Sequence, residues 1–442
     1  MLPARVFTCI SSVAASLALG CSHVQPAPKK PPSVTLVFRT VVHTRQLYFD
    51  HSRIEPRRML VAGIKAVASV APGLDVDATD PASLTLSSRS HSRVFDLRDA
   101  GSFWGADALF RAMHGYLTGS LGIPDGDRQI GFAAANGMLS TLDPGCALVS
   151  EEEFLTRRTV SEDVPLSSLL AIGSLGADVT YLRLAGLPVG TATVLGRLLG
   201  ARSRFGGMIL DLRGNSVGLF QEAVRVANLF METGLRMEFR VGAQLGATGQ
   251  MRNARTIWHG PLVILADDRT ASGAEIIVAV LKDLDRAVVF GARTAGVGTM
   301  QASMVDTDPD DGRKAYLELT VGTFKRPSGV GIDGLGIAPD LSFVRTDLAG
   351  HAEQATHLGV PSLNPFAAPA GPSDSPERSI AEVSYVWQAP ADRSTPQEFL
   401  LQDPEIRLAR ELLVRAPKSH RSEMLEELKR LAKETPSAPK SQ

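Results

Sequence analysis

One serine stands where a predicted strand meets a predicted helix, and that position could do chemistry. Ser272 follows the apolar run Pro261–Ala266 and a short polar loop, and it precedes apolar residues at helical spacing. At the head of a helix the backbone N–H groups lack partners and the dipole is positive, so they could stabilise an oxyanion if Ser272 attacked a carbonyl. Gly273 would let a substrate approach the backbone closely. By itself the pattern predicts an ordinary N-cap, with Glu275 as its capping-box partner.

The elements that must hold this serine alternate between strands and helices from Gln129 to Asp340, which is typical of an α/β domain. The expected strands are Asp178–Leu184, Gly207–Leu212, Pro261–Ala266 and Arg286–Gly291, and the expected helices are Thr191–Leu199, Leu219–Glu232 and the segment after Ser272. Each expected strand delivers a loop at its carboxyl end, where open α/β sheets place their sites.

Five blocks of sequence resemble, in order, the tail-specific (C-terminal processing) serine peptidase family. They are residues 137–139 with 142–144 and 152–154, then 211–218, 261–276, 291–301, and 319–321 with 327–329 and 336–340. Agreement of several blocks in one order is specific, and the blocks span nearly half of the chain. The resemblance implies an α/β fold with the crotonase/Clp-protease-like ββα core of these peptidases, carrying helical N-terminal and C-terminal appendages.

The resemblance also assigns roles to single residues. The family's nucleophile falls on Ser272, and the glutamine of its Ser–Lys–Gln arrangement falls on Gln301. The oxyanion donors fall on the N–H groups of Gly218 and Gly273. The family's general base is a lysine between two glycines, and that position is occupied here by Val297.

The loss of this lysine predicts a degenerate site. A serine hydroxyl is a poor nucleophile until a neighbouring base takes its proton, and valine has no lone pair. Removing one member of such a catalytic unit costs on the order of 10⁴-fold in rate. The oxyanion turn is also altered, because Val217 stands where the family prefers glycine and a β-branched residue restricts the backbone. We therefore expect a peptide- or protein-binding scaffold that retains the peptidase fold.

Two alternatives stay open. In the first, the protein is an active serine endopeptidase with a displaced base; Lys325 is then the nearest candidate by motif, whereas Lys282 is expected to face solvent on its helix. In the second, the protein has a structural role in assembly of the cell envelope, carried by the helical N-terminal part and the tail. In either case protein or peptide ligands are the expected partners.

The N-terminus resembles a bacterial lipoprotein signal. Met1–Arg5 carries one positive charge, and the apolar stretch Val6–Leu19 is too short to span a membrane comfortably. It ends in Ala-Leu-Gly before Cys21, which resembles a lipobox with that cysteine as the lipid acceptor. The alternative is a soluble secretory signal with a coincidental cysteine. We expect a lipid anchor at Cys21, with no other membrane contact, and a cell-envelope or periplasmic location.

The chain divides into six expected parts. They are a signal peptide (1–20), a tether (21–33), a helix-rich region (34–128), the peptidase-like domain (129–345), a Pro/Ser/Ala-rich linker (346–396) and a helical tail (397–442). The helix-rich region is expected to contain a helical pair broken near Pro56 and a short strand at Ser83–Ser87. Between Phe154 and the strand at Val179 there is no room for the PDZ domain that family members commonly carry, since a domain needs about 50 residues or more.

Composition excludes several other classes. The formal net charge is -1, and no basic stripe indicates nucleic-acid binding. Of the three cysteines, two lie in the leader, so Cys146 stands alone and predicts neither a disulfide framework nor a metal site. No cofactor motif is present in the sequence. The sequence names no substrate and no oligomeric state.

Overall fold

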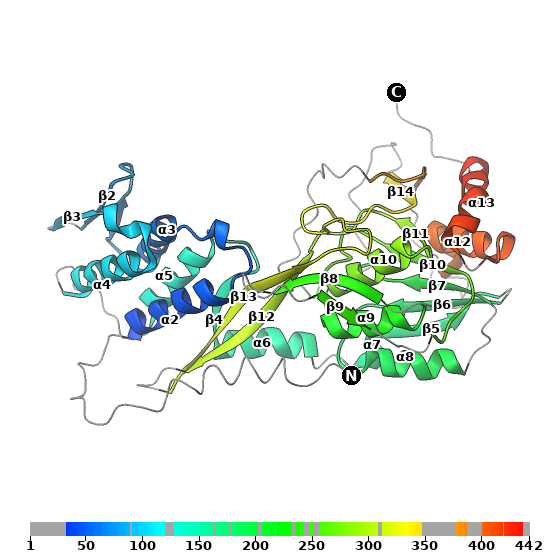
Figure 1. Ribbon diagram of the computed structural model, residues 1–442, viewed down its shortest axis with the longest axis horizontal. Helices are drawn as coiled ribbons and strands as arrows, with labels where there is room; N and C mark the ends of the chain where they lie inside the picture. The colour runs from blue at the N-terminus through cyan, green and yellow to red at the C-terminus, as the bar shows by residue number, and fades with distance from the viewer. Residues whose placement is uncertain are drawn as a thin grey trace.

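The computed structural model describes most of the chain, as two units joined by a long two-stranded ribbon (Figure 1). The described residues are 32–88, 91–119, 128–162, 165–176, 178–201, 206–216, 218–231, 235–241, 248–251, 256–307, 312–346, 377–386, 400–418 and 420–435. The predictions for the leader, Cys21 and Val217, and most of the expected linker, lie outside these residues. Within the described part of the chain, no helix has the length and apolar character needed to cross a membrane.

The N-terminal unit is a helical cluster with a small antiparallel sheet. Its elements are α2 (Pro32–Leu47), α3 (Pro56–Ala68), α4 (Phe103–Gly119), α5 (Gln129–Leu139), β1 (Asp75–Asp77), β2 (Ser83–Ser87) and β3 (Ser92–Asp96). The predicted break falls at Pro56, which occupies the first turn of α3, where its missing N–H costs nothing. Helices α3 and α5 pack closely at Gly137, which has no side chain. A Cβ there would lie 2.5 Å from the Ala62 carbonyl oxygen. The predicted domain start at residue 129 therefore falls on a helix that packs in this unit.

A seven-stranded sheet forms the centre of the second unit, in the order β15-β14-β11-β10-β7-β6-β5. Its strands are β5 (Leu170–Ser174), β6 (Val179–Leu184), β7 (Gly207–Asp211), β10 (Leu262–Ala266), β11 (Val288–Gly291), β14 (Leu341–Thr346) and β15 (Ala381–Val386). All neighbours pair in parallel except β5 and β6. The fold is α/β, as expected, and its strand bounds follow the predicted ones closely.

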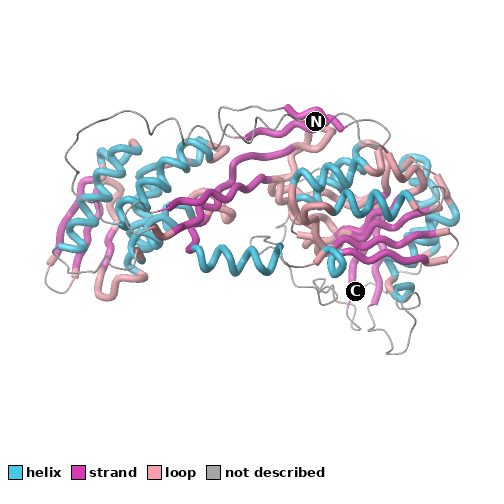
Figure 2. The backbone as a smooth tube through the Cα atoms, turned by 90° about the horizontal axis from the view of Figure 1, so that it is seen from below, coloured by secondary structure: helices cyan, strands magenta, loops and turns pink. Residues whose placement is uncertain are grey.

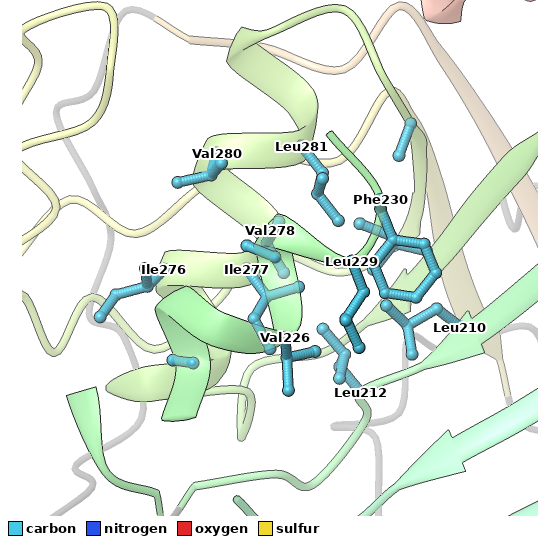
Figure 3. Packing of buried hydrophobic residues seen from close by; sticks show 14 of the residues in the cluster. Leu210, Leu212, Val226, Leu229, Phe230, Ile276, Ile277, Val278, Val280 and Leu281 are labelled. Carbon is cyan, nitrogen blue, oxygen red and sulfur yellow. The ribbon is translucent and has the colours of Figure 1, made fainter. Parts of the chain in front are cut away.

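Helices cover both faces of this sheet (Figure 2), which explains why β7 and β10 are buried throughout. The helices are α8 (Thr191–Gly200), α9 (Phe220–Asn228), α10 (Gly273–Asp283), α12 (Pro404–Arg415) and α13 (Arg421–Glu434). Leu210 and Leu212 pack with α9 and α10 in one core (Figure 3), whereas Ile209 and Leu265 pack with α12 and α13 in another. The expected helical tail is thus a layer of the α/β unit.

One expected loop contains a strand. β15 lies inside the predicted linker 346–396 and pairs in parallel with β14 along Leu341–Thr346. The segment as a whole is rich in Pro, Ser and Ala, so its composition predicts a loop. The six residues Ala381–Val386 within it nevertheless form a strand at the edge of the sheet. Between Phe154 and Asp178 the described residues form α6 (Glu151–Glu162), α7 (Leu166–Leu169) and β5, which belongs to the main sheet.

The ribbon joins the two units through one shared strand. β12 (Thr299–Thr307) pairs with β13 (Lys314–Phe324), which also pairs with β4 (Ala147–Ser150) and β8 (Leu235–Val241). β9 (Thr248–Met251) adds to β8. Leu317 and Leu319 lie in the N-terminal core, whereas Phe324 lies in the α/β core. The ribbon of Figure 1 is therefore continuous with both cores.

Candidate active site

Ser272 lies at the head of α10, after the loop that follows β10, as the sequence predicts. Its backbone has φ 54° and ψ −118°, a conformation that residues other than glycine rarely adopt. Such strained backbone conformations are often found at functional sites. The loop is held from within, because the Asp267 carboxylate accepts the N–H groups of Gly214 and Arg269 at 2.9 and 3.1 Å. Ser272 is half-buried. A fixed, strained and accessible serine is what a nucleophile position requires.

The two glycines predicted as oxyanion donors lie beside each other. A Cβ at Gly273 would come 3.4 Å from the Gly218 carbonyl oxygen, so the turn ending at Gly218 lies against the head of α10. A Cβ at Gly218 would lie 2.5 Å from that of Leu187, so no larger residue fits there. The Asn215 carbonyl accepts the Ala271 N–H at 2.9 Å, which ties the same turn to the residue before Ser272.

Glu275 joins the serine to the loop that carries Val297. Its carboxylate is fully buried, and Oε2 accepts the N–H groups of Ser272 at 3.0 Å and Val297 at 2.7 Å. Oε1 accepts the Thr294 hydroxyl at 2.5 Å and the Gly296 N–H at 2.8 Å. The capping-box reach to Ser272 was predicted from the spacing of three residues. The bonds to residues 294–297 were not, because nothing in the local sequence signals them.

Val297 lies close to Ser272, because both residues donate to the same carboxylate oxygen. The Ser272 and Val297 nitrogens bond to one oxygen, so they lie within about 6 Å of each other. The Val297 side chain is half-buried. A lysine in this backbone position would start from the same place.

Glu275 is not placed to act as a general base for Ser272. Burial raises the pKa of its carboxyl to about 7, against the pull of its hydrogen bonds from Thr294, Gly296, Val297 and Ser272. Each carboxylate oxygen accepts two donors, so the usual acceptor sites of both oxygens are filled. No acceptor position is left for the Ser272 hydroxyl proton. Glu275 therefore joins the start of α10 to residues 294–297 through these four hydrogen bonds, and we call this set of bonds the Glu275 latch.

Gln301 lies on the ribbon, with its amide at the junction with the N-terminal unit. Its Nε2 donates to the Thr320 hydroxyl at 3.3 Å, and that hydroxyl donates to Asp143 at 2.8 Å. A Cβ at Gly145 would lie 1.7 Å from Nε2, so a glycine there makes room for the amide. The hydrogen bond of Gln301 is thus to Thr320 and not to Ser272.

The two candidate replacement lysines lie in different places. The expectation that Lys282 faces solvent is wrong: it is buried and donates to the Ala338 carbonyl and to Glu377, both at 2.5 Å. These partners come from distant segments, and Lys282 is about 15 Å along α10 from Ser272. Lys325 is exposed and follows Phe324, whose N–H donates to the Gly298 carbonyl at 3.1 Å. Lys325 therefore lies next to the Val297 loop.

Comparison with known proteins identifies the α/β unit. Residues 178–343 match the model of peptidase family S41. Over these residues the chain is similar to the tail-specific peptidases. A chloroplastic C-terminal processing peptidase of Tetradesmus obliquus is 30% identical over 194 residues, covering 42% of this chain and 40% of that protein. A carboxyl-terminal-processing protease of Synechocystis is 32% identical over 196 residues, covering 43% and 44%. The chain thus spans less than half the length of these relatives.

A solved structure with a similar fold is that of a photosystem II D1 C-terminal processing protease. The comparison gives a TM-score of 0.42 and 18% sequence identity, and it covers 64% of this chain and 92% of that one. Among the described residues, no group of three or more His, Cys, Asp or Glu side chains could hold a metal ion.

Proposed function

We propose that this chain is a lipid-anchored protein of the cell envelope whose tail-specific peptidase domain binds peptides or proteins and no longer cleaves them efficiently. The observation that carries the proposal is the bond from the Val297 N–H to Glu275, which fixes a residue without a lone pair beside Ser272. A serine without a base keeps its hydroxyl proton, so acyl transfer is slow.

Peptide binding is supported by what the site retains. The head of α10 and the turn ending at Gly218 lie together, so the two backbone positions proposed as carbonyl donors are neighbours. Backbone N–H groups at the head of a helix can bind a carbonyl oxygen whether or not the serine attacks it. The ligand class we propose is therefore an extended peptide or a protein segment.

Recognition of chain ends by a PDZ domain is not part of the proposal. The described residues between Phe154 and Asp178 belong to α6, α7 and β5, and β5 is already paired in the main sheet. A peptide ligand would reach the site without being selected by its C-terminus through such a domain.

A second function, an active endopeptidase with a displaced base, is favoured by one contact. The Phe324 N–H donates to the Gly298 carbonyl, and this places Lys325 beside the loop that holds Val297. A lysine becomes a base when it loses solvent, because desolvation disfavours its charged form. Substrate closure over Lys325 would supply that desolvation.

Labelling with a fluorophosphonate probe, which reacts with activated serines, separates the two functions. We expect little labelling of Ser272 in the unmodified protein and at least about tenfold more in Val297→Lys, because a lysine there is partly desolvated and can act as a base. Val305→Lys is the matched control, since this exposed position on β12 lies farther along the ribbon. Adding Val217→Gly to Val297→Lys should raise labelling further.

Strong labelling of the unmodified protein that Ser272→Ala abolishes would overturn the proposal. Loss of that labelling in Lys325→Ala would then establish the displaced base. Equal labelling of Val297→Lys and Val305→Lys would show that position 297 does not govern the serine.

A further inference from the structure

The C-terminal tail is joined to the turn that ends at Gly218 by a buried set of charges. The Arg213 guanidinium donates from Nη1 to Asp403 at 2.8 Å and to Glu405 at 3.1 Å. Asp403 is also the N-cap of α12, where its carboxylate accepts the N–H groups of Glu405 and Ile406. The start of α12 is therefore built around this arginine.

The other side of Arg213 is equally fixed. Its Nε and Nη2 donate to the fully buried Asp211 at 3.0 and 2.7 Å. Asp211 also accepts the Tyr181 hydroxyl at 2.7 Å and pairs with Arg183 at 3.3 Å. Buried charges are tolerated only when they are paired, so movement of Arg213 would take this partner from Asp403 and Glu405 and leave Asp211 with Arg183 and Tyr181.

Arg213 begins the turn that leads to the site. The next residue, Gly214, donates its N–H to Asp267 at 2.9 Å, and the carbonyl of Asn215 accepts the Ala271 N–H. A short path of hydrogen bonds thus runs from the tail carboxylates through this turn to the residue before Ser272. The tail lies beyond the residues that match the peptidase family, which end at 343.

The tail is also held at its other end, so it cannot act as a loose cover. Arg421 at the start of α13 donates to Asp340 at 2.9 and 2.5 Å. The backbone N–H of Ser422 donates to Asp285, just after α10, at 2.7 Å. Between these points α12 packs Leu408 and Leu412 into the second core.

We propose that Arg213, Asp403 and Glu405 are positioning residues: the tail holds the Arg213–Gly218 turn, and with it the Gly218 N–H, in place to receive a peptide carbonyl. This inference rests on the proposed peptide-binding function of the site. It assigns to the tail, a segment outside the peptidase match, a direct part in ordering the ligand site.

The charges around Glu405 make this attachment sensitive to pH. Burial raises the pKa of Glu405 to about 8; Arg213 opposes this, and Asp403, Asp211 and Asp267 reinforce it. Because the pKa in the folded protein exceeds the ordinary value, ionisation of Glu405 opposes docking, and the attachment weakens as pH rises from about 5 to 8. Replacing Glu405 by glutamine should remove that part of the dependence.

Hydrogen–deuterium exchange of the full chain tests the proposal without any ligand. In Asp403→Asn/Glu405→Gln, peptides covering Arg213–Ser216 and Thr270–Gly273 should exchange at least about tenfold faster, because the turn opens more often. The hairpin Ser83–Asp96 should be unchanged. Arg415→Gln is the matched control, since within the described residues this tail arginine pairs with Glu411 on α12 and with Glu427 and Glu434 on α13.

Two further measurements separate positioning from general stability. Combining Arg213→Gln with the two tail substitutions should add less than the separate effects, because both remove the same interaction. Exchange at the turn, corrected for its intrinsic pH dependence, should rise between about pH 5 and 8 in the wild type and stay flat in Glu405→Gln.

Unchanged exchange at the turn in folded variants, or strictly additive effects, would overturn the proposal. Since no peptide is used, that outcome is distinct from a failure of peptide binding. If the double variant does not fold, Glu405→Gln alone replaces it, because glutamine keeps an acceptor for Arg213. Exchange at the turn in this variant must then stay flat with pH where that of the wild type rises.

Discussion

Replacing Glu275 by glutamine tests whether the latch holds the site together. Glutamine keeps one carbonyl oxygen, which can accept two of the four donors that now bond to the carboxylate. The amide NH₂ would face the other two donors. Each buried donor left without an acceptor costs about 1–3 kcal/mol, so Glu275→Gln should lower the free energy of unfolding by about 2–6 kcal/mol.

The assay is urea unfolding, with Glu222→Gln as the matched control. Glu222 is also a buried carboxylate in the first turn of a core helix, but among the described residues it accepts just two donors, the Ala192 N–H at 3.0 Å and the largely exposed Arg225 at 2.8 Å. Glutamine can keep the bond to Ala192, so this variant should lose about 1 kcal/mol or less. Equal losses in the two variants would refute the latch.

Titration adds a second signature of the latch. Because burial raises the pKa of Glu275 to about 7, the cost of ionising it in the folded protein grows as pH rises from about 4.5 to 7. The wild type should lose that increment of unfolding free energy between pH 5 and 8, and Glu275→Gln should not. A wild type with the same pH slope as the variant would contradict the buried carboxyl as its source.

Three other outcomes are expected. Detergent-phase partitioning should fall sharply in Cys21→Ala if the mature protein begins at a lipidated cysteine, and equal partitioning would remove the anchor from the proposal. Leu265→Asp should cost several kcal/mol in urea unfolding, because it buries an unpaired charge in the central strand, whereas Ser272→Ala should cost at most about 1 kcal/mol. Burial opposes ionisation of Asp211, but Arg213 outweighs it and lowers the Asp211 pKa to about 2. The folded protein should therefore lose about 2 kcal/mol as pH falls from about 4 to 2, with a smaller slope in Asp211→Asn.

The central strands and the head of α10 could be predicted because their signals are local. An apolar run such as Leu262–Ala266 indicates a buried strand wherever it occurs, and the spacing from Ser272 to Glu275 indicates a capping box from three residues alone. The family's glycine–lysine–glycine position placed Val297 near the serine before any geometry was known.

The sequence could not predict which charged residues would pair when they are distant along the chain. Nothing around Lys282 predicts that Glu377 will meet it, and the solvent-facing interpretation failed for that reason. The pairing of Arg213 with Asp403 is of the same kind, because it joins positions 190 residues apart. Such pairs depend on which faces the assembled layers bring together, and periodicity within one helix does not report that.

The shared strand β13 sets an order of events during synthesis. The N-terminal unit is made first, yet its core includes Leu317 and Leu319, which follow it by well over a hundred residues. Until β13 emerges, β4 lacks its partner strand and this core stays open to water. The nascent chain must therefore hold its first unit incomplete while the α/β strands are still being made, the reverse of the usual N-terminal-first order. A chain exported during that interval would complete both units only after translocation.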